Sequence, residues 1–581
     1  MSILASIDDV TAGARQWDER QTVARLYADW LSQTLPRQVL DGSIDDGAFD
    51  EYDHGWRDGR WSAFTLARLV AARSWADEIG INPQRLEMPI RRAAAFLLRR
   101  QSPRGELDLG GAYSPIEVGF TVPGLVRAYQ RMEAFPELTG PREQLGEFLR
   151  KATPAVLRAE ALTANHRWAA VCAALAALNT LWPNKAYVDR IEQYLSDGID
   201  CDEDGLWHIE RCPNYANVAN HGLIVMANCL GRPELLDHVV RSCQLLPFML
   251  QPNGEADTSF SHRQSRAAPN VKALSYACLR FAAIRSGDGR IASLARRALG
   301  ERTLGDMLYP LPFVLDDHPH EQPAELALPE QYDLHLESPQ IARRRADQTA
   351  LTLAADSGGH FFDSVRDSWG GLRRSDDWLH LHHGSIVLQS IQLAIGGVQN
   401  LQPDWLEVDS PGHYRLGGCR EGWKHTLHFR PGWPQIDMHW GLSHSINVDH
   451  EDEVLRVGLV ARATNALVAN LRLFIRAGAT ISGGGVDRQR LEAGQTIDLG
   501  GGEELELSNG PDRITISGLP QAAHHAIIVH AEPIPSVKSE HCAVLSLGLR
   551  MPVDLKLQLF LHPRTPFFIS SQSATVNDAA R

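Results

Sequence analysis

The stretch "LTANHRWAAVCAALAALNTLWP", residues 162–183, begins with four side chains able to bind a sugar or a carboxylate and continues as apolar helical sequence. These are Asn165, His166, Arg167 and Trp168, an amide, an imidazole, a guanidinium and an indole. Amide donors and helix N-termini both favour a carboxylate, because both direct N–H groups at negative charge. The alternative is structural, since Asn165 is also a suitable N-cap residue. This helix start is therefore a candidate carboxylate site or a capped helix end.

Two further stretches interrupt the apolar pattern with the same mixture of polar side chains. They are "DEDGLWHIERCPNYANVANHG" at 202–222 and "QPNGEADTSFSHRQSR" at 251–266. Each stretch falls at a helix start or in a loop between helices, and such loops gather at one rim when helical hairpins stack. We therefore expect one cleft, with these substrate-binding residues: Trp168, Trp207, His208, Glu210, Arg211, His262 and Arg263.

The elements that must position these clusters are helical between about residues 20 and 300. Apolar residues recur there every three or four positions, as in "WSAFTLARLVAARSWADEIG", which predicts amphipathic helices. Gly and Pro separate the segments, as in "GINPQ" and "LWPNK". Ten or more helices with short to medium loops predict stacked helical hairpins, arranged as an open solenoid or a closed toroid.

After about residue 350 the apolar period becomes two. Segments such as "HTLHFRP", "EVLRVGLVARA" and "LKLQLFLHP" alternate or are rich in β-branched residues, with turn residues between them. This pattern predicts an antiparallel β-sandwich. The Pro- and Asp-rich composition of the stretch between the halves indicates a linker. We therefore expect a helical domain over 1–310, a linker over 311–350 and a β-sandwich domain over 351–581.

Composition excludes several classes of function. The chain has 581 residues, of which 44% are hydrophobic and 22% charged, typical of a soluble globular protein with two or three domains. The formal net charge of −14 disfavours nucleic acid as a partner. No apolar run is long enough to span a membrane, the eight cysteines form no CxxC pair, and the N-terminus has no basic region typical of a signal peptide. A cytoplasmic location is the expectation.

The chain resembles the heparinase II/III-like polysaccharide lyases, with their alginate-lyase and rhamnose–glucuronate lyase relatives. Asn165-His166 is similar to the Asn-His pair that begins a toroid helix in this family, and "DGLWHIERCPNY" is similar to the stretch that ends in its catalytic tyrosine. Residues 370–397 look like the strand pair that opens its β-domain. The resemblance implies an (α/α) toroid followed by an antiparallel β-sandwich, with Asn165, His166 and Tyr215 as catalytic residues.

The chemistry that the resemblance implies is β-elimination at a uronic acid of an oligosaccharide or polysaccharide. A donor must neutralise the uronate carboxylate so that the proton at C5 becomes acidic enough to remove. Asn165 suits this role, helped by His166 or Arg263, because an amide donates without changing its protonation state. Tyr215 would act as base, as acid, or as both in a syn elimination.

The stretch "LHLHHG" is a candidate metal site in the β-domain. His380 and His382 fall on the same face of a strand, a spacing that can chelate zinc. The related lyases have an Asp after this run, whereas here His382 and His383 are followed by Gly384 and Ser385. We therefore expect no metal and no cofactor, and we expect His382 to act as a donor to the substrate.

Two other classes of function remain open from the sequence. A glycoside hydrolase on the same toroid would need a pair of carboxylates, for which Asp53, Asp58, Asp108 and Glu117 are candidates. A non-catalytic carbohydrate-binding protein would show aromatic platforms without a tyrosine and a cation beside it. The Asn-His and Tyr matches favour the lyase, because neither alternative uses them.

Overall fold

The computed structural model shows a helical unit and a β unit, which we describe separately. The described residues are 18–50, 57–109, 112–161, 163–262, 274–299, 308–355, 378–395, 399–400, 403–427, 436–451, 453–463, 468–476, 478–492, 494–499, 504–519, 525–529, 542–550 and 552–562. The helical unit comprises Met1–Ile209, Pro213–Pro247 and Val271–Leu328, and the β unit comprises Glu210–Cys212, Phe248–Asn270 and Pro329–Arg581.

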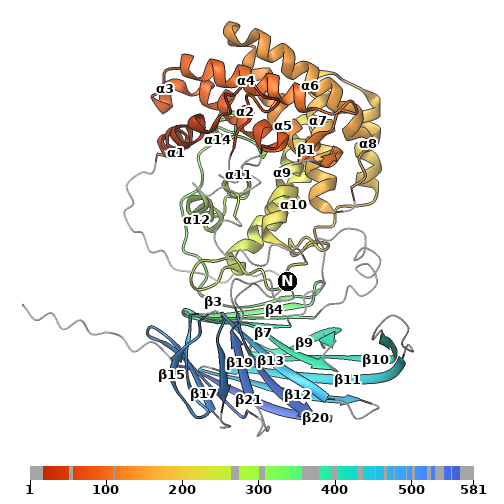
Figure 1. The fold of residues 1–581 in the computed structure, drawn as a ribbon, viewed down its shortest axis with the longest axis vertical. Helices are drawn as coiled ribbons and strands as arrows, with labels where there is room; N and C mark the ends of the chain where they lie inside the picture. Colours follow the sequence, from red (N-terminus) through yellow and green to blue (C-terminus); the bar gives the residue numbers. More distant parts are fainter. Residues whose placement is uncertain are drawn as a thin grey trace, which may run out of the picture. The chain divides into compact units, whose positions relative to one another are not determined.

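The helical unit is a set of helical hairpins (Figure 1). Helix pairs α2–α4, α5–α6, α7–α8, α9–α10 and α11–α12 pack within each hairpin, and α2, α5, α7, α9 and α11 contact one another in succession as the inner helices. None of the described helices is long and apolar enough to cross a membrane. The helices are α1 (Glu19–Thr34), η1 (Leu35–Arg37), α2 (Gly59–Ser74), α3 (Ala76–Ile79), α4 (Gln84–Arg100), α5 (Pro115–Met132), η2 (Pro136–Leu138), α6 (Thr139–Arg158), η3 (His166–Cys172), α7 (Ala173–Leu181), α8 (Lys185–Ser196), α9 (Pro213–Leu230), η4 (Pro233–Leu235), α10 (Leu236–Leu245), η5 (Leu246–Met249), α11 (Tyr276–Ser286), α12 (Gly289–Ala298) and α14 (Leu311–Asp317).

Side-chain caps begin three of the inner helices. Asp58 accepts a hydrogen bond from the Trp61 amide before α2, at 2.7 Å. Ser114 accepts from the Glu117 amide before α5, and Ser275 accepts from the Cys278 amide before α11. Each cap satisfies one backbone N–H that the first helical turn leaves without a partner. A short hairpin, β1 (Leu107–Leu109) and β2 (Ala112–Ser114), precedes α5.

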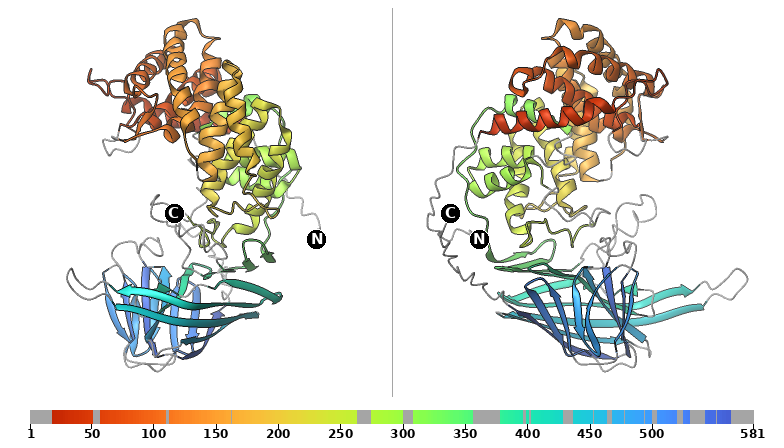
Figure 2. Two further views of the ribbon diagram at one scale, coloured as in Figure 1. Left: turned by 90° about the vertical axis from the view of Figure 1, so that its right-hand side faces the viewer. Right: turned by 60° about the vertical axis from the view of Figure 1, so that its left-hand side comes forward.

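The β unit consists of two antiparallel sheets that enclose one apolar core (Figure 2). One sheet has the order β15-β14-β17-β18-β21-β12-β11-β10-β9 and the other the order β16-β19-β20-β13-β7-β6-β5-β4-β3, with β8 paired to β7. Alternate residues of strands such as β12 and β21 face this core, as the period of two predicts. The strands are β3 (Gln331–Leu336), β4 (Ile341–Ala346), β5 (Thr349–Ala354), β6 (Leu379–His383), β7 (Ile386–Ile395), β8 (Gln399–Asn400), β9 (Trp405–Ser410), β10 (His413–Leu427), β11 (Ile436–Glu451), β12 (Val454–Ala463), β13 (Val468–Arg476), β14 (Thr480–Gly483), β15 (Val486–Arg490), β16 (Thr496–Leu499), β17 (Glu504–Asn509), β18 (Asp512–Ser517), β19 (His525–Val529), β20 (Cys542–Arg550) and β21 (Val553–His562).

A buried ion pair ties an early segment of the chain to the β unit. The Arg343 guanidinium, on β4, is paired with the carboxylate of Asp257, and both side chains are fully buried. The same guanidinium donates to the Phe248 and Leu250 carbonyls at 2.7 Å each, and Thr352 on β5 also donates to Asp257. Segment 248–262 therefore belongs to the sandwich, although helices precede and follow it in the sequence.

The predicted fold class, a helical toroid followed by an antiparallel β-sandwich, is confirmed. The predicted linker over 311–350 is wrong, because it contains α14, β3 and β4. The first strand of the β unit is thus β3, which begins at Gln331, ahead of the strand pair expected at 370–397. Strand β4 has the sequence "IARRRA", in which three arginines obscure the alternation of apolar and polar residues expected of a strand. Arg343 occupies a buried position there because its charge is paired with Asp257.

Candidate active site

The helix that begins at Asn165 starts with a π-helical turn. Residues His166–Cys172 form the π-helix η3, which continues directly as α7. π-Helical turns are rare and occur frequently at functional sites. The Asn165-His166 pair therefore lies where the backbone departs from ordinary helical geometry.

Two glycines allow the neighbouring helices to approach this turn closely. A Cβ atom at Gly119 on α5 would lie 2.0 Å from the Ala170 carbonyl oxygen, and one at Gly222 on α9 would lie 2.5 Å from the Trp168 carbonyl carbon. Both positions require glycine for this reason, since the obstructing atoms are backbone. The π-turn is therefore held between α5 and α9 at backbone contact.

The three helices run parallel. Trp168, near the start of η3, meets Gly222 in the middle of α9, whereas Thr180 of α7 and Cys229 of α9, both further along their helices, line one cavity. Likewise Ala170 meets Gly119, and Thr180 accepts a hydrogen bond from Gln130 of α5 at 3.3 Å. The N-termini of α5, η3 and α9 consequently point the same way, and their partial positive charges add at that end.

Asn165 and Tyr215 lie at this common N-terminal end. Asn165 is three residues before Trp168, and Tyr215, in the first turn of α9, is seven residues before Gly222. With a rise of about 1.5 Å per residue, both lie within about 10 Å of that contact along the helix axes. Tyr215 is partly exposed.

The Asn165 amide is oriented by a neighbour and does not cap its helix. Its backbone is already helical and its side chain makes no capping bond. Instead the Thr163 hydroxyl donates to Asn165 Oδ1 at 2.6 Å, which assigns the oxygen and leaves the Nδ2 hydrogens directed elsewhere as donors. The amide is 1% exposed, so any group that it binds is held out of water.

Two histidines of the helical unit have defined neighbours. His166 is half-buried and packs edge-on against Phe120 of α5, with ring centroids 5.9 Å apart. His208 Nε2 lies 3.1 Å from a carboxylate oxygen of Asp202. His166 therefore adjoins Asn165 in the wall formed by α5 and η3, while His208 is held beside a carboxylate in the loop before α9.

The structure contradicts the predicted substrate-binding role of two tryptophans, Trp168 and Trp207. Trp168 is 0% exposed and Trp207 is 1% exposed, so neither indole offers a face to a sugar ring. Trp207 Nε1 donates to Asn220 at 3.2 Å, and Asn220 donates to Ser242 at 3.1 Å, which joins α9 to α10. Both indoles belong to the packing of the helices, because an apolar ring within helical spacing is core more often than ligand site.

Four predicted substrate-binding residues lie in the β unit. Glu210 and Arg211 are buried, and Arg211 has a φ of 44°, a left-handed backbone that costs energy for a residue with a side chain. His262 and His382 are each 1% exposed. Arg263 lies outside the described residues.

His382 is the most isolated of these polar groups. Neither of its ring nitrogens has a hydrogen-bond partner within the described ranges. Burial lowers the pKa of His382 well below its usual range, and His380 and Arg476 lower it further. His382 is therefore neutral near pH 7, with one nitrogen as donor and the other as acceptor. In the described part of the chain, no three His, Cys, Asp or Glu side chains are placed to hold a metal ion.

In sequence, the chain matches no protein-family model and no curated protein. In structure, it is similar to the chondroitin AC lyase of Streptomyces coelicolor A3 in complex with chondroitin sulphate, with a TM-score of 0.52, 11% identity, and coverage of 95% of this chain and 80% of that one. A chondroitinase AC lyase solved with oligosaccharides has a TM-score of 0.50, 10% identity, and coverage of 94% and 83%. The chain shares the fold of these two chondroitin AC lyases.

A heparan sulfate lyase mutant from Pedobacter heparinus is also similar, with a TM-score of 0.48, 11% identity, and coverage of 95% of this chain and 84% of that one. The two chondroitin AC lyases share their fold with nearly the whole of this chain at very low identity. Thr163, Phe120, Gly119 and Gly222 place the candidate residues within it, and the sequence analysis missed all four. Only Thr163 could have been found from the sequence, because a threonine two residues before Asn165 is close enough to bind its side chain.

Proposed function

We propose that the protein is a polysaccharide or oligosaccharide lyase that cleaves a glycosidic bond at a uronic acid by β-elimination. The observation that carries the proposal is the Asn165 amide, which is buried, oriented by Thr163 and not used for capping. An amide donor at the common N-terminal end of three parallel helices suits a carboxylate whose charge grows during the reaction. The polysaccharide-lyase fold supports this proposal.

In the proposed reaction, Asn165 binds the uronate carboxylate and His166 assists it. Tyr215 removes the proton from C5 as the bond between C4 and the glycosidic oxygen breaks. The leaving oxygen takes up a proton, from the same tyrosine in a syn elimination. The products are a 4,5-unsaturated uronate and a new hydroxyl end, so no oxidant, metal or water is consumed.

A glycoside hydrolase is the second candidate, and one observation favours it. Burial raises the pKa of Asp58 to about 6, and the charges of Glu117 and Asp108 also raise it. A carboxyl group protonated near neutral pH beside carboxylates is what glycosidic hydrolysis requires. However, Asp108 is paired with Arg100, Glu117 is paired with Arg60 at 2.6 Å, and Asp58 caps α2. Asp53 lies outside the described residues.

One assay separates the candidates. The protein is incubated with uronate-containing oligosaccharides while ultraviolet absorbance and reducing ends are followed together. A lyase raises both, because the new C=C bond is conjugated with the carboxylate, whereas a hydrolase raises only reducing ends. New reducing ends without absorbance would overturn the lyase proposal in favour of the hydrolase. If neither signal changes over a broad panel of uronate glycans, the lyase proposal is also contradicted.

A further inference from the structure

The helical unit contains a cavity of about 440 Å³ at the end opposite the candidate active site. It lies between the C-terminal halves of α5, α7 and α9, the start of α11, and the segment that carries α14. Asn228 is thirteen residues after Tyr215 on α9, which is about 20 Å along the helix. The cavity is therefore separate from the residues proposed for catalysis.

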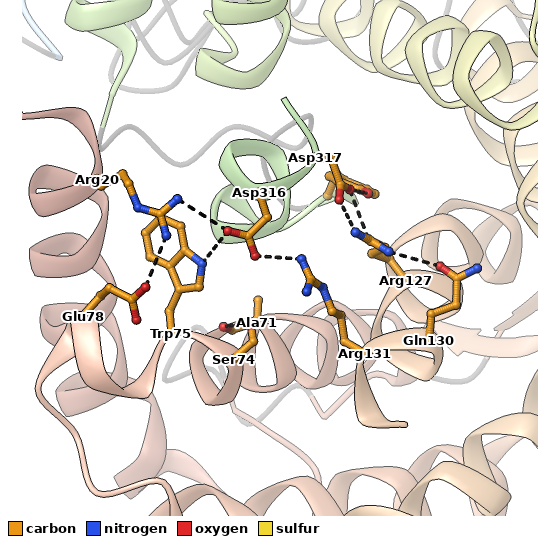
Figure 3. A network of polar contacts seen from close by, with 11 residues as sticks. Arg20, Ala71, Ser74, Trp75, Glu78, Arg127, Gln130, Arg131, Asp316 and Asp317 are labelled. Atoms are coloured by element: carbon orange, nitrogen blue, oxygen red, sulfur yellow. Dashed lines mark hydrogen bonds and ion pairs between the residues drawn. The ribbon is translucent and has the colours of Figure 1, made fainter. Parts of the chain in front are cut away.

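Ion pairs fix the floor of this cavity. Asp316 on α14 accepts from the Trp75 indole at 3.0 Å and from Arg131 at 2.8 Å, and Asp317 is paired with Arg127 on α5 (Figure 3). Arg20 on α1 lies 3.5 Å from Asp316 (Figure 3). Helix α14 is thus held to α1 and α5 by ion pairs and to Trp75, between α2 and α3, by a hydrogen bond, so the cavity has firm walls.

The lining has no uncompensated charge. Arg127 is paired with Asp317, and Arg280 is paired with Glu19 at 2.9 Å. Burial lowers the pKa of His221 to about 4 and also lowers that of His318, so both imidazoles are neutral near pH 7. The C-terminal ends of α5, α7 and α9 add partial negative charge. The cavity therefore disfavours an anion.

The polar groups that line the cavity can exchange their present hydrogen bonds for bonds to a ligand. Gln130 donates to Thr180 at 3.3 Å, and Asn228 Nδ2 lies 3.3 Å from His318 Nε2, and both contacts are exposed. Sugar hydroxyls can replace such long, exposed hydrogen bonds. Phe281 packs edge-on against His318, with centroids 5.2 Å apart, and supplies an aromatic wall for C–H groups.

We propose that this cavity is a second carbohydrate site, specific for an uncharged mono- or disaccharide. Its volume lies within the range usual for small-ligand sites, about 300 to 1,000 Å³. Amide, hydroxyl and imidazole groups on one side and an aromatic ring on the other match the hydroxyl-rich edge and the apolar face of a neutral sugar. The inference does not depend on the reaction proposed for the opposite end.

Cys229 provides the test. It lines the cavity, is partly exposed, and burial raises the pKa of its thiol to about 11, so it reacts slowly with a maleimide. Cys419, exposed in the β unit, is an internal control in the same sample. Labelling rates of both thiols are measured by peptide mass spectrometry in the full chain, with glucose, rhamnose, N-acetylglucosamine, maltose, cellobiose or glucuronate added.

We expect at least one neutral sugar to slow the labelling of Cys229 about tenfold when its concentration is ten times its Kd, and to leave Cys419 unchanged. The double variant Gln130→Ala/Asn228→Ala should lose this protection and keep wild-type lyase activity, while Gln193→Ala on the exposed face of α8 keeps both. Thr180→Val serves as a second cavity variant. Protection by glucuronate alone, by no sugar, or equally in wild type and cavity variants would overturn the proposal.

Discussion

Asn165 differs from the other polar residues that begin inner helices in what its side chain contacts. Asp58, Ser114 and Ser275 accept hydrogen bonds from the first turns of their helices. Asn165 instead accepts from the Thr163 hydroxyl. Its amide oxygen accepts no hydrogen bond from the first turn of its helix, so the capping alternative left open by the sequence is contradicted.

Asn165→Ala should lower turnover on a uronate substrate by two to three decades. The lost donor stabilises charge that grows in the transition state, and such a donor contributes about 3 to 4 kcal/mol. A methyl ester of the same substrate, whose charge is already masked, should lose much less. Initial rates on acid and ester are the measurement.

Asn184→Ala is the matched control for this variant. Asn184 caps α8 by accepting from the Ala186 amide at 3.0 Å. Its loss should cost about 1 kcal/mol of unfolding free energy and leave the rate unchanged. If Asn165→Ala behaves as Asn184→Ala does, with a lower melting temperature and equal losses on acid and ester, Asn165 has only a structural role.

Tyr215→Phe should lower turnover by about 10² to 10⁴ and leave substrate binding nearly unchanged, because general acid–base transfer contributes in that range. Binding is measured by calorimetry and turnover by the appearance of the unsaturated product. Tyr187→Phe, on α8 and buried in packing, should keep wild-type turnover. A Tyr215→Phe enzyme that retains more than half of its activity excludes this tyrosine as the base.

At the scale of elements, two glycine contacts set the distance between the helices that carry the candidate residues. Periodicity predicted the helices, and turn residues predicted their ends. A sequence pattern cannot show that Gly119 and Gly222 face the backbone of one π-turn, because that contact joins residues far apart in the chain. The buried pair of Arg343 and Asp257 was missed for the same reason, since a charged residue within a strand predicts an exposed position.

Gly222→Ala should separate α9 from η3. The added methyl would lie 2.5 Å from the Trp168 backbone, so the helices must shift, at a cost of about 1 to 3 kcal/mol. We also expect lower turnover, because Tyr215 moves relative to Asn165. Gly140→Ala on α6, where the nearest atom is an Arg91 side-chain nitrogen at 3.5 Å, should be neutral or stabilising in the same denaturation experiment. Equal stability of both variants would contradict the backbone contact.

Arg343→Met should lower the unfolding free energy of the β unit by about 3 to 5 kcal/mol, because it leaves the Asp257 carboxylate buried without its partner. Arg344→Met is the control, since Arg344 is partly exposed in its pair with Asp333 and should cost at most about 1 kcal/mol. The double variant Arg343→Met/Asp257→Leu should recover most of the loss. Urea denaturation of the three variants measures these losses. A loss of unfolding free energy in Arg343→Met no larger than that in Arg344→Met would contradict the burial of the pair.

At the scale of the whole molecule, acidic and basic groups give opposing pH dependences. The pKa of Asp58 is raised to about 6, so its ionisation costs stability as pH rises from about 4 towards 7. The pKa of His221 is lowered to about 4, so it loses stability as pH falls from about 6.5 towards 4. Both groups lie in the helical unit, and their effects partly cancel in the native chain.

Asp58→Asn should therefore stabilise the protein at pH 7 and not at pH 4. The amide keeps the capping oxygen and removes the ionisation cost, which is about 3 kcal/mol for a two-unit shift in pKa. Melting temperatures of wild type and variant across this pH range are compared. A difference that is the same at both ends of the range would show that the carboxyl of Asp58 titrates normally.

The pairing of Asp257 with Arg343 also has a consequence for the order in which the chain is made. Ribosomes complete segment 248–262 well before they synthesise β4, so the Asp257 carboxylate stays solvated until Arg343 has been added to the chain. A fragment that stops at Leu328 would keep this segment and lack the sheet that receives it. The segments of the β unit are thus interleaved along the gene with those of the helical unit, and a recombination event with its breakpoint between residues 257 and 343 would separate partners that fold together.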